Sequence, residues 1–116
     1  MLKSLLGQSA ESHAEAFLKT HGLKLVARNW RCRFGEIDLV MQDGPTLVFV
    51  EVRLRSRSDF GGAAASVTPG KQKKLLAAAR QYLGALKTLP PCRFDVVALD
   101  NDAAPEWIKN AFDDMG

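Results

Sequence analysis

The chain has 116 residues, 47% of them hydrophobic and 25% charged, and a formal net charge of +3 at pH 7. This composition is typical of one globular domain over residues 1–116 and excludes a disordered chain. Its apolar runs are far shorter than the roughly 20 residues of a membrane span, and residues 1–6 are too short for a secretory signal. We therefore expect a cytoplasmic protein that does not contact a membrane.

The charge is distributed unevenly along the chain. In residues 100–116 five acids face one base, so this acidic C-terminal segment carries −4 and residues 1–99 carry +7. Between Arg28 and Arg80, ten Lys or Arg stand against five Asp or Glu. A basic region of this kind permits an anionic partner such as nucleic acid, although a solvated basic surface explains it equally well.

The two cysteines, Cys32 and Cys92, have no further Cys or His at zinc-finger spacing. This usage predicts neither a disulfide framework nor a Cys-rich zinc site. We expect two free thiols near strand ends.

The first half of the chain predicts one helix followed by three strands. Apolar residues at helical spacing indicate a helix over residues 10–20, with Ser9 as its N-cap and Gly22 as its stop. Glu11 lies at the border of the apolar stripe of this helix. Three runs that suit a pleated sheet then predict strands, over residues 23–29, 36–41 and 46–54.

The second half begins with a polar loop over residues 54–68. Thr68 and Pro69 are typical of the N-cap and first turn of a helix, which we expect to run to about residue 86. A strand over residues 94–99 follows, and residues 107–112 form either an edge strand or a helical turn. The buried side of the second helix is expected to carry Leu75, Leu76, Ala79, Tyr82, Leu83 and Leu86.

This order of elements predicts an α/β (α+β) fold. Three consecutive strands favour an antiparallel meander, and the following helix permits a crossover to a parallel neighbour. The expected architecture is a mixed sheet flanked by helices.

A two-residue turn at Asp43-Gly44 is the strongest local signal and predicts a hairpin register. In that register Asp38 lies opposite Phe49, and Glu36 lies opposite Glu51. Because side chains alternate along a strand, one face then carries Glu36, Asp38, Glu51 and Arg53. The other face is expected to be core, formed by Ile37, Leu39, Val48, Val50 and Val52.

Three carboxylates on one small face repel one another, and a divalent cation would offset that repulsion. Oxygen-only ligands suit a hard cation, so the residues predict an Mg²⁺ (or Mn²⁺) site formed by Asp38, Glu51 and Glu36. The alternative is structural. Glu36 then pairs with Arg53 or Arg33 at the surface, and Asp38 caps a neighbouring backbone group.

Lysines crowd the first turn of the second predicted helix, where the positive end of the helix dipole disfavours cations. Lys71, Lys73 and Lys74 would be stabilised by an anion there, and Arg55 and Arg57 in the preceding loop add positive charge. The alternative is that the lysine side chains only reach solvent. We expect Lys71 to lie near Glu51.

Several segments resemble the YraN-like family of small bacterial proteins, and the match spans nearly the whole chain. They are RCRFGEIDLV at 31–40, FVEVR at 49–53, VTPGKQ at 67–72, RFDVV at 93–97 and WIKNAF at 107–112. That family is similar in fold pattern to archaeal Holliday-junction resolvases, PD-(D/E)xK nucleases and tRNA-splicing endonucleases. The resemblance implies a restriction-endonuclease-like α-β-β-β-α-β core.

The resemblance also implies roles for individual residues. Asp38, Glu51, Arg53 and Glu11 would be catalytic, and Lys71 would lie close to Glu51. With the basic residues noted above, the nucleic-acid contacts that we expect are Lys71, Lys73, Arg55, Arg57 and Gln72. One departure concerns Arg53, which stands where the nuclease pattern has lysine. A guanidinium stays protonated and cannot act as a general base, but it can stabilise charge on a phosphate in the transition state.

Three functions follow as hypotheses. The first is a metal-dependent endonuclease that hydrolyses phosphodiester bonds in DNA, including branched or junction DNA, and the analogy with resolvases implies a homodimer. The second is a nucleic-acid-binding module that kept the fold without turnover. The third is an interaction subunit whose acidic tail docks on a partner.

Overall fold

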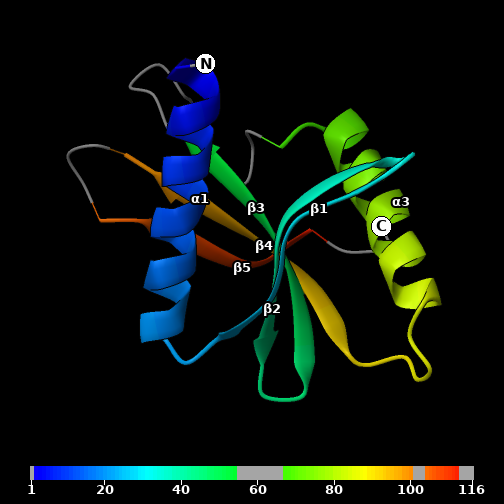
Figure 1. Cartoon of the computed structure of the whole chain (residues 1–116). Helices are drawn as coiled ribbons and strands as arrows, with labels where there is room; N and C mark the ends of the chain where they lie inside the picture. The colour runs from blue at the N-terminus through cyan, green and yellow to red at the C-terminus, as the bar shows by residue number, and fades with distance from the viewer. Residues whose placement is uncertain (1, 55–66, 101–103, 113–116) are drawn as a thin grey trace.

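The structure is a computed structural model that describes residues 2–54, 67–100 and 104–112. Most of the predicted polar loop, with Arg55 and Arg57, lies outside these residues. Within the described ranges, no helix is long and apolar enough to cross a membrane. The elements are α1 (Leu2–Thr20), β1 (Lys24–Cys32), β2 (Gly35–Asp43), β3 (Thr46–Leu54), α3 (Pro69–Gly84), β4 (Cys92–Leu99) and β5 (Glu106–Phe112) (Figure 1).

The five strands form one mixed sheet in the order β1-β2-β3-β4-β5. The β1–β2, β2–β3 and β4–β5 pairs are antiparallel, whereas β3 and β4, which α3 connects, are parallel. The predicted meander and crossover are confirmed, and the fold is α+β. Residues 107–112 belong to an edge strand and not to a helical turn.

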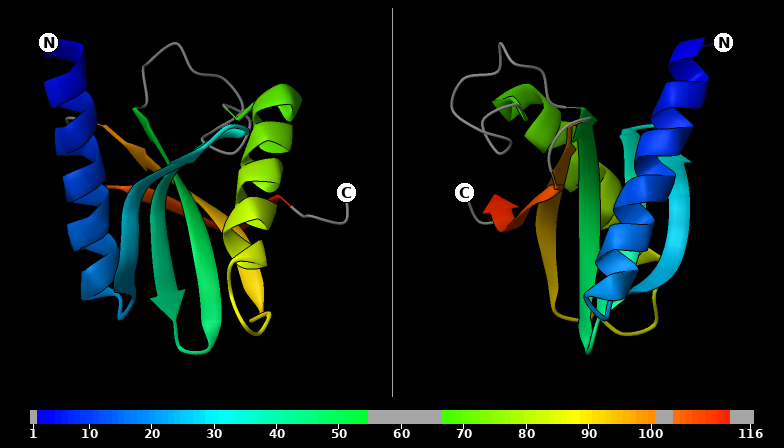
Figure 2. Two further views of the ribbon diagram at one scale, coloured as in Figure 1. Left: turned by 45° about the vertical axis from the view of Figure 1, so that its right-hand side comes forward. Right: turned by 90° about the vertical axis from the view of Figure 1, so that its left-hand side faces the viewer.

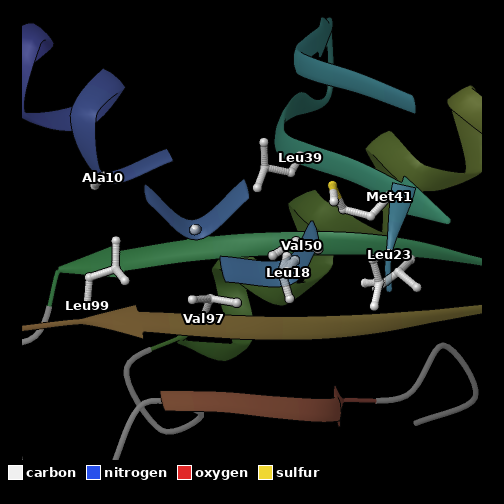
Figure 3. Packing of buried hydrophobic residues seen from close by; sticks show 10 residues of the cluster. Ala10, Leu18, Leu23, Leu39, Met41, Val50, Val97 and Leu99 are labelled. Carbon is white, nitrogen blue, oxygen red and sulfur yellow. The ribbon is translucent and has the colours of Figure 1, made fainter. Parts of the chain in front are cut away.

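The helices cover opposite faces of the sheet (Figure 2). Ala10, Ala14 and Leu18 of α1 pack on one face against residues such as Leu39 and Val50 (Figure 3). On the other face, Ala78 and Ala79 of α3 belong to a cluster that also contains Val40, Leu47, Phe49 and Phe94. Both faces of β3 are therefore buried, as expected for a central strand with a helix on each side.

The helix ends agree in part with the sequence. Gly22 follows α1 with φ +90, a conformation that suits glycine, but α1 begins at Leu2, so the prediction of Ser9 as its N-cap was wrong. Thr68 caps α3 as predicted, and its hydroxyl oxygen accepts the Lys71 N–H at 3.2 Å. Because α3 ends at Gly84, Leu86 is exposed and not on the buried side.

The β2–β3 register differs from the prediction by two residues. Asp43 pairs with Thr46 and Val40 with Phe49, so the turn is Gly44-Pro45 and not Asp43-Gly44. Gly44 has φ +58, which suits the first turn position, and the fixed negative φ of proline suits the second. The predicted pairs of Asp38 with Phe49 and of Glu36 with Glu51 were wrong.

The ladder between β2 and β3 ends at the pair Leu39–Val50. Beyond it, the β1–β2 hairpin runs toward α3, while β3 continues toward the side of α1 (Figures 1 and 2). Ile37 accordingly packs in the α3-side cluster, not on the α1 face with Leu39 as predicted. The two strands thus diverge at the residues that precede Leu39 and follow Val50.

The edge strand β5 is held by a buried carboxylate on β4. Asp95 is fully buried and accepts hydrogen bonds from Arg93 Nε at 3.0 Å, Trp107 Nε1 at 3.0 Å and the Asn110 N–H at 2.9 Å. Arg93 also reaches Asp43 at 3.0 Å. Asp95 therefore has a structural role. Cys32 lies at the end of β1 and Cys92 at the start of β4, and no disulfide joins them.

Candidate functional site

Acidic side chains from three elements meet where β2 leaves β3. Glu11 comes from α1, and Glu36 and Asp38 come from β2. One carboxylate oxygen from each of these three residues lies within 4.8 Å of the others. Glu51 of β3 lies beside them and shares a hydrogen bond with Asp38. The structure therefore brings together all four acids that the sequence singled out.

Asp38 is oriented by the backbone of β3. Its Oδ2 accepts the Val52 N–H at 2.9 Å. Because β2 stops pairing with β3 at Leu39, this N–H has no ladder partner, and the carboxylate takes the place of the missing carbonyl. Asp38 thus caps a neighbouring backbone group, as the structural alternative predicted. This hydrogen bond also holds the Asp38 carboxylate close to the other acids.

Glu51 is a buried acid with one basic neighbour. Its side chain is 6% exposed, and Lys71 Nζ lies 3.4 Å from its Oε1, where we expected Lys71. Burial raises the pKa of Glu51 to about 8, the Asp38 carboxylate adds to the rise, and Lys71 opposes it. The metal-free site therefore holds a proton that an added positive charge would displace.

The pKa of the Glu11 carboxyl is raised as well. Burial raises its pKa to about 7, the carboxylates of Asp38 and Glu36 add to the rise, and a hydrogen bond with Asn29 opposes it. Glu11, which was predicted at the border of the apolar stripe of the helix, therefore lies beside the acids of the sheet.

One helical turn after Glu11, a salt bridge that the sequence did not reveal ties α1 to β1. Glu15 is buried, and its two oxygens accept Arg28 Nε at 2.6 Å and Nη2 at 2.9 Å. Lys19 Nζ lies 2.7 Å from Glu15 as well. This bidentate contact fixes α1 against the strand that carries Asn29 and so positions Glu11.

Two adjoining cavities give access to these residues. One, of about 490 Å³, opens toward α3, and the other, of about 350 Å³, opens toward α1. Asp38, Glu51 and Lys71 line both, so they lie where the two cavities meet. We call the combined space the cleft. Its other lining residues include Gly35, Glu36, Gly70 and Lys74 on the α3 side and Glu11, Val52 and Arg53 on the α1 side.

Arg53 lines the α1 side of the cleft. Its Nε is buried, and no described residue accepts a hydrogen bond from it. The surface ion pair that we considered for Glu36 does form, but with Arg31 at 3.5 Å and not with Arg53 or Arg33. Arg53 thus adds a positive charge to the wall of the cleft.

The other predicted nucleic-acid contacts are placed differently from one another. Lys73 is exposed and does not line the cleft, whereas Lys74, on the same helix, does. Gln72 donates from Nε2 to the Val67 carbonyl at 3.0 Å, so its side chain secures the start of α3.

The donor set fits a hard divalent cation. All its ligand atoms are carboxylate oxygens, the donors that Mg²⁺ and Mn²⁺ prefer. Ligands held about 2.1 Å from a cation lie no more than about 4.2 Å apart, so Glu11, Glu36 and Asp38 need only a small contraction. The predicted set had Glu51 in place of Glu11. In the structure, Glu51 instead contacts Asp38 and Lys71.

The fold and the cleft define a small α+β domain with an acidic centre and basic groups around it. Residues 10–99 match the model of a family described as uncharacterised protein family UPF0102. A UPF0102 protein of Nitrosospira multiformis is 57% identical over 115 residues, covering 97% of each chain. Another, of Nitrosomonas eutropha, is 56% identical over 108 residues, covering 93% of each chain. The chain belongs to the UPF0102 family, which confirms the YraN-like resemblance.

Proposed function

We propose that this protein is a metal-dependent endonuclease that hydrolyses phosphodiester bonds in DNA. The observation that carries the proposal is the convergence of Glu11, Glu36, Asp38 and Glu51, from three elements, on one cleft with Lys71. Carboxylates this close together repel one another, and a bound cation would offset that repulsion. The similarity to resolvases and PD-(D/E)xK nucleases is part of this proposal.

The residues of the cleft divide into two groups. Glu11, Glu36 and Asp38 would hold the cation, which when bound stabilises charge on the phosphate and activates a water. Lys71, held beside Glu51, and the backbone N–H groups at the start of α3 supply positive charge for a phosphate. Arg53, which lines the α1 side of the cleft, adds positive charge for a phosphate from the other side.

Lys71 supplies an ammonium group close to Glu51, whereas residue 53 is an arginine and has none. The nuclease pattern has lysine two residues after the glutamate, and here that residue is arginine. Lys71 Nζ reaches Glu51 from the neighbouring helix at 3.4 Å. It can therefore assume the role of the missing lysine in orienting a water near Glu51.

The test is cleavage of labelled DNA with added Mg²⁺ or Mn²⁺. Its substrates are linear duplex and branched DNA, the class that the family resemblance implies. We expect Asp38→Asn and Glu51→Gln each to lower the cleavage rate by about 100-fold or more, as is typical when a catalytic group is lost. Lys71→Ala should also lower it, and Lys87→Ala, which removes an exposed lysine beyond the C-terminal end of α3 and outside the cleft, is the matched control.

Two outcomes contradict the proposal in different ways. Cleavage that survives both Asp38→Asn and Glu51→Gln would place the activity elsewhere. DNA binding without cleavage under any divalent cation would favour the second candidate, a non-catalytic binding module, for which the arginine at position 53 is the supporting observation.

A further inference from the structure

The turn between β1 and β2 presents an aromatic ring next to basic side chains. Phe34 is 40% exposed, and the Arg33 guanidinium carbon lies 4.9 Å from the centre of its ring. Among the large hydrophobic side chains that are exposed in the described residues, Phe34 is the one with an aromatic ring, and such a ring can stack on a nucleic-acid base.

The hairpin is fixed against α3, so the turn has a defined place. Trp30 packs edge-on against Tyr82 with ring centroids 5.3 Å apart. Cys32 packs against the same α3-side cluster. Gly35 lies so close to α3 that an added Cβ would be 3.6 Å from the Lys74 Cβ. The alternation along β1 therefore directs Trp30 and Cys32 inward and leaves Arg31 and Arg33 exposed.

The turn continues directly into the wall of the cleft. Gly35 and Glu36 line its α3 side, and Arg31 lies 3.5 Å from Glu36. Phe34 precedes Asp38 by four residues, so their Cα atoms lie at most about 13 Å apart. Bases along one DNA strand are spaced about 3.4 Å apart, so a strand a few nucleotides long can reach from the acidic centre to the ring.

We propose that Phe34, with Arg33 beside it, stacks on an unpaired base at a branch in DNA whose phosphate occupies the cleft. This inference rests on the proposed nuclease function and assigns the recognition of its substrate to one side chain. In a continuous duplex each base face is covered by its neighbours, whereas a branch or fork leaves a face free for an aromatic side chain. The exposed guanidinium group of Arg33 adds positive charge beside the ring for a phosphate of that strand.

The test measures binding separately from cleavage. Fluorescence anisotropy with Ca²⁺ in place of Mg²⁺ gives the Kd for a forked duplex and for the linear duplex of the same length. A 2-aminopurine at the fork reports stacking through loss of its fluorescence. We expect Phe34→Ala to weaken binding to the fork by about tenfold, to abolish the quenching and to leave binding to the linear duplex within about twofold.

Two variants serve as controls. Phe34→Trp preserves an aromatic face and should restore binding to the fork. Leu89→Ala removes another exposed apolar side chain, 76% exposed and beyond the far end of α3, and should change neither Kd. Equal binding of the fork by Phe34→Ala and wild type, or equal loss on both substrates, would overturn the proposal. If wild type binds neither substrate, the nuclease proposal itself fails, and this inference fails with it.

Discussion

The buried carboxyl of Glu51 should make the stability of the metal-free protein fall as the pH rises. Burial and Asp38 raise its pKa from the ordinary 4.5 to about 8. The contribution of such a carboxyl to the free energy of unfolding is fully present below about pH 4.5, the pKa in the unfolded chain. It falls as the pH rises from there and is lost above about pH 8, the pKa in the folded protein. At about 1.4 kcal/mol per pH unit, that interval corresponds to roughly 5 kcal/mol.

The substitution Glu51→Gln tests this reasoning, because a glutamine amide is uncharged at every pH. Urea unfolding of wild type and variant in the presence of a chelator gives the free energy of unfolding from about pH 5 to about pH 9. We expect the variant to gain on wild type progressively from about pH 5 to about pH 8, by up to about 4 kcal/mol, and to gain no more above pH 8. A divalent cation should restore much of the loss in wild type at high pH, because it binds only the folded, ionised cluster.

Glu15→Gln is the matched control, because Glu15 is also a buried glutamate but Arg28 lowers its pKa. A lowered pKa contributes stability above about pH 4.5 and loses it as the pH falls through the folded value. Glu15→Gln should therefore be less stable than wild type at neutral pH, and the difference should shrink in acid. A constant difference in unfolding free energy between Glu51→Gln and wild type at all pH values would refute the buried, protonated Glu51.

Three further predictions concern the residues around the cleft. Arg28→Ala should lower both the melting temperature and the cleavage rate, because Glu15 then no longer ties α1 to β1. Arg28 does not line the cleft, so an unchanged cleavage rate in a fully folded variant would contradict its positioning role. Asp95→Ala should lower the free energy of urea unfolding by about 3–5 kcal/mol, since it leaves three donors without their acceptor, and a loss below about 1 kcal/mol would contradict this. Arg53→Ala should weaken DNA binding and reduce the slope of the logarithm of the binding constant against the logarithm of the salt concentration by about 0.9, whereas Arg53→Lys should retain that slope. A slope unchanged by the alanine substitution would show that Arg53 does not contact a phosphate.

The sequence predicted the right face of β3 for a wrong register, and the reason is physical. Side chains alternate with a period of two, and the observed register differs from the predicted one by two residues. Glu51 therefore kept its side of the strand, although the pairs across the ladder changed. A register error of one residue would have reversed the faces.

Other parts of the site could not be predicted from local patterns. The side chain of Glu15 finds Arg28 thirteen residues later, across two elements whose packing angle no local pattern specifies. Ile37 was placed on the face of Leu39 because regular alternation was assumed along the whole strand. The divergence of β2 toward α3 ends that regularity, and only the three-dimensional structure shows where it begins.

The end of the β2–β3 ladder explains both the stability and the chemistry of the site. One more step of pairing beyond Leu39–Val50 would place Asp38 directly opposite Glu51, and like charges opposite each other destabilise a sheet. The strands separate at that step. The Asp38 carboxylate replaces the lost ladder contact by accepting the Val52 N–H, and the space beside it becomes the cleft. The separation of the strands thus keeps Asp38 and Glu51 from pairing across the ladder and leaves Asp38 free to meet Glu11 and Glu36, the carboxylates that a divalent cation would bridge.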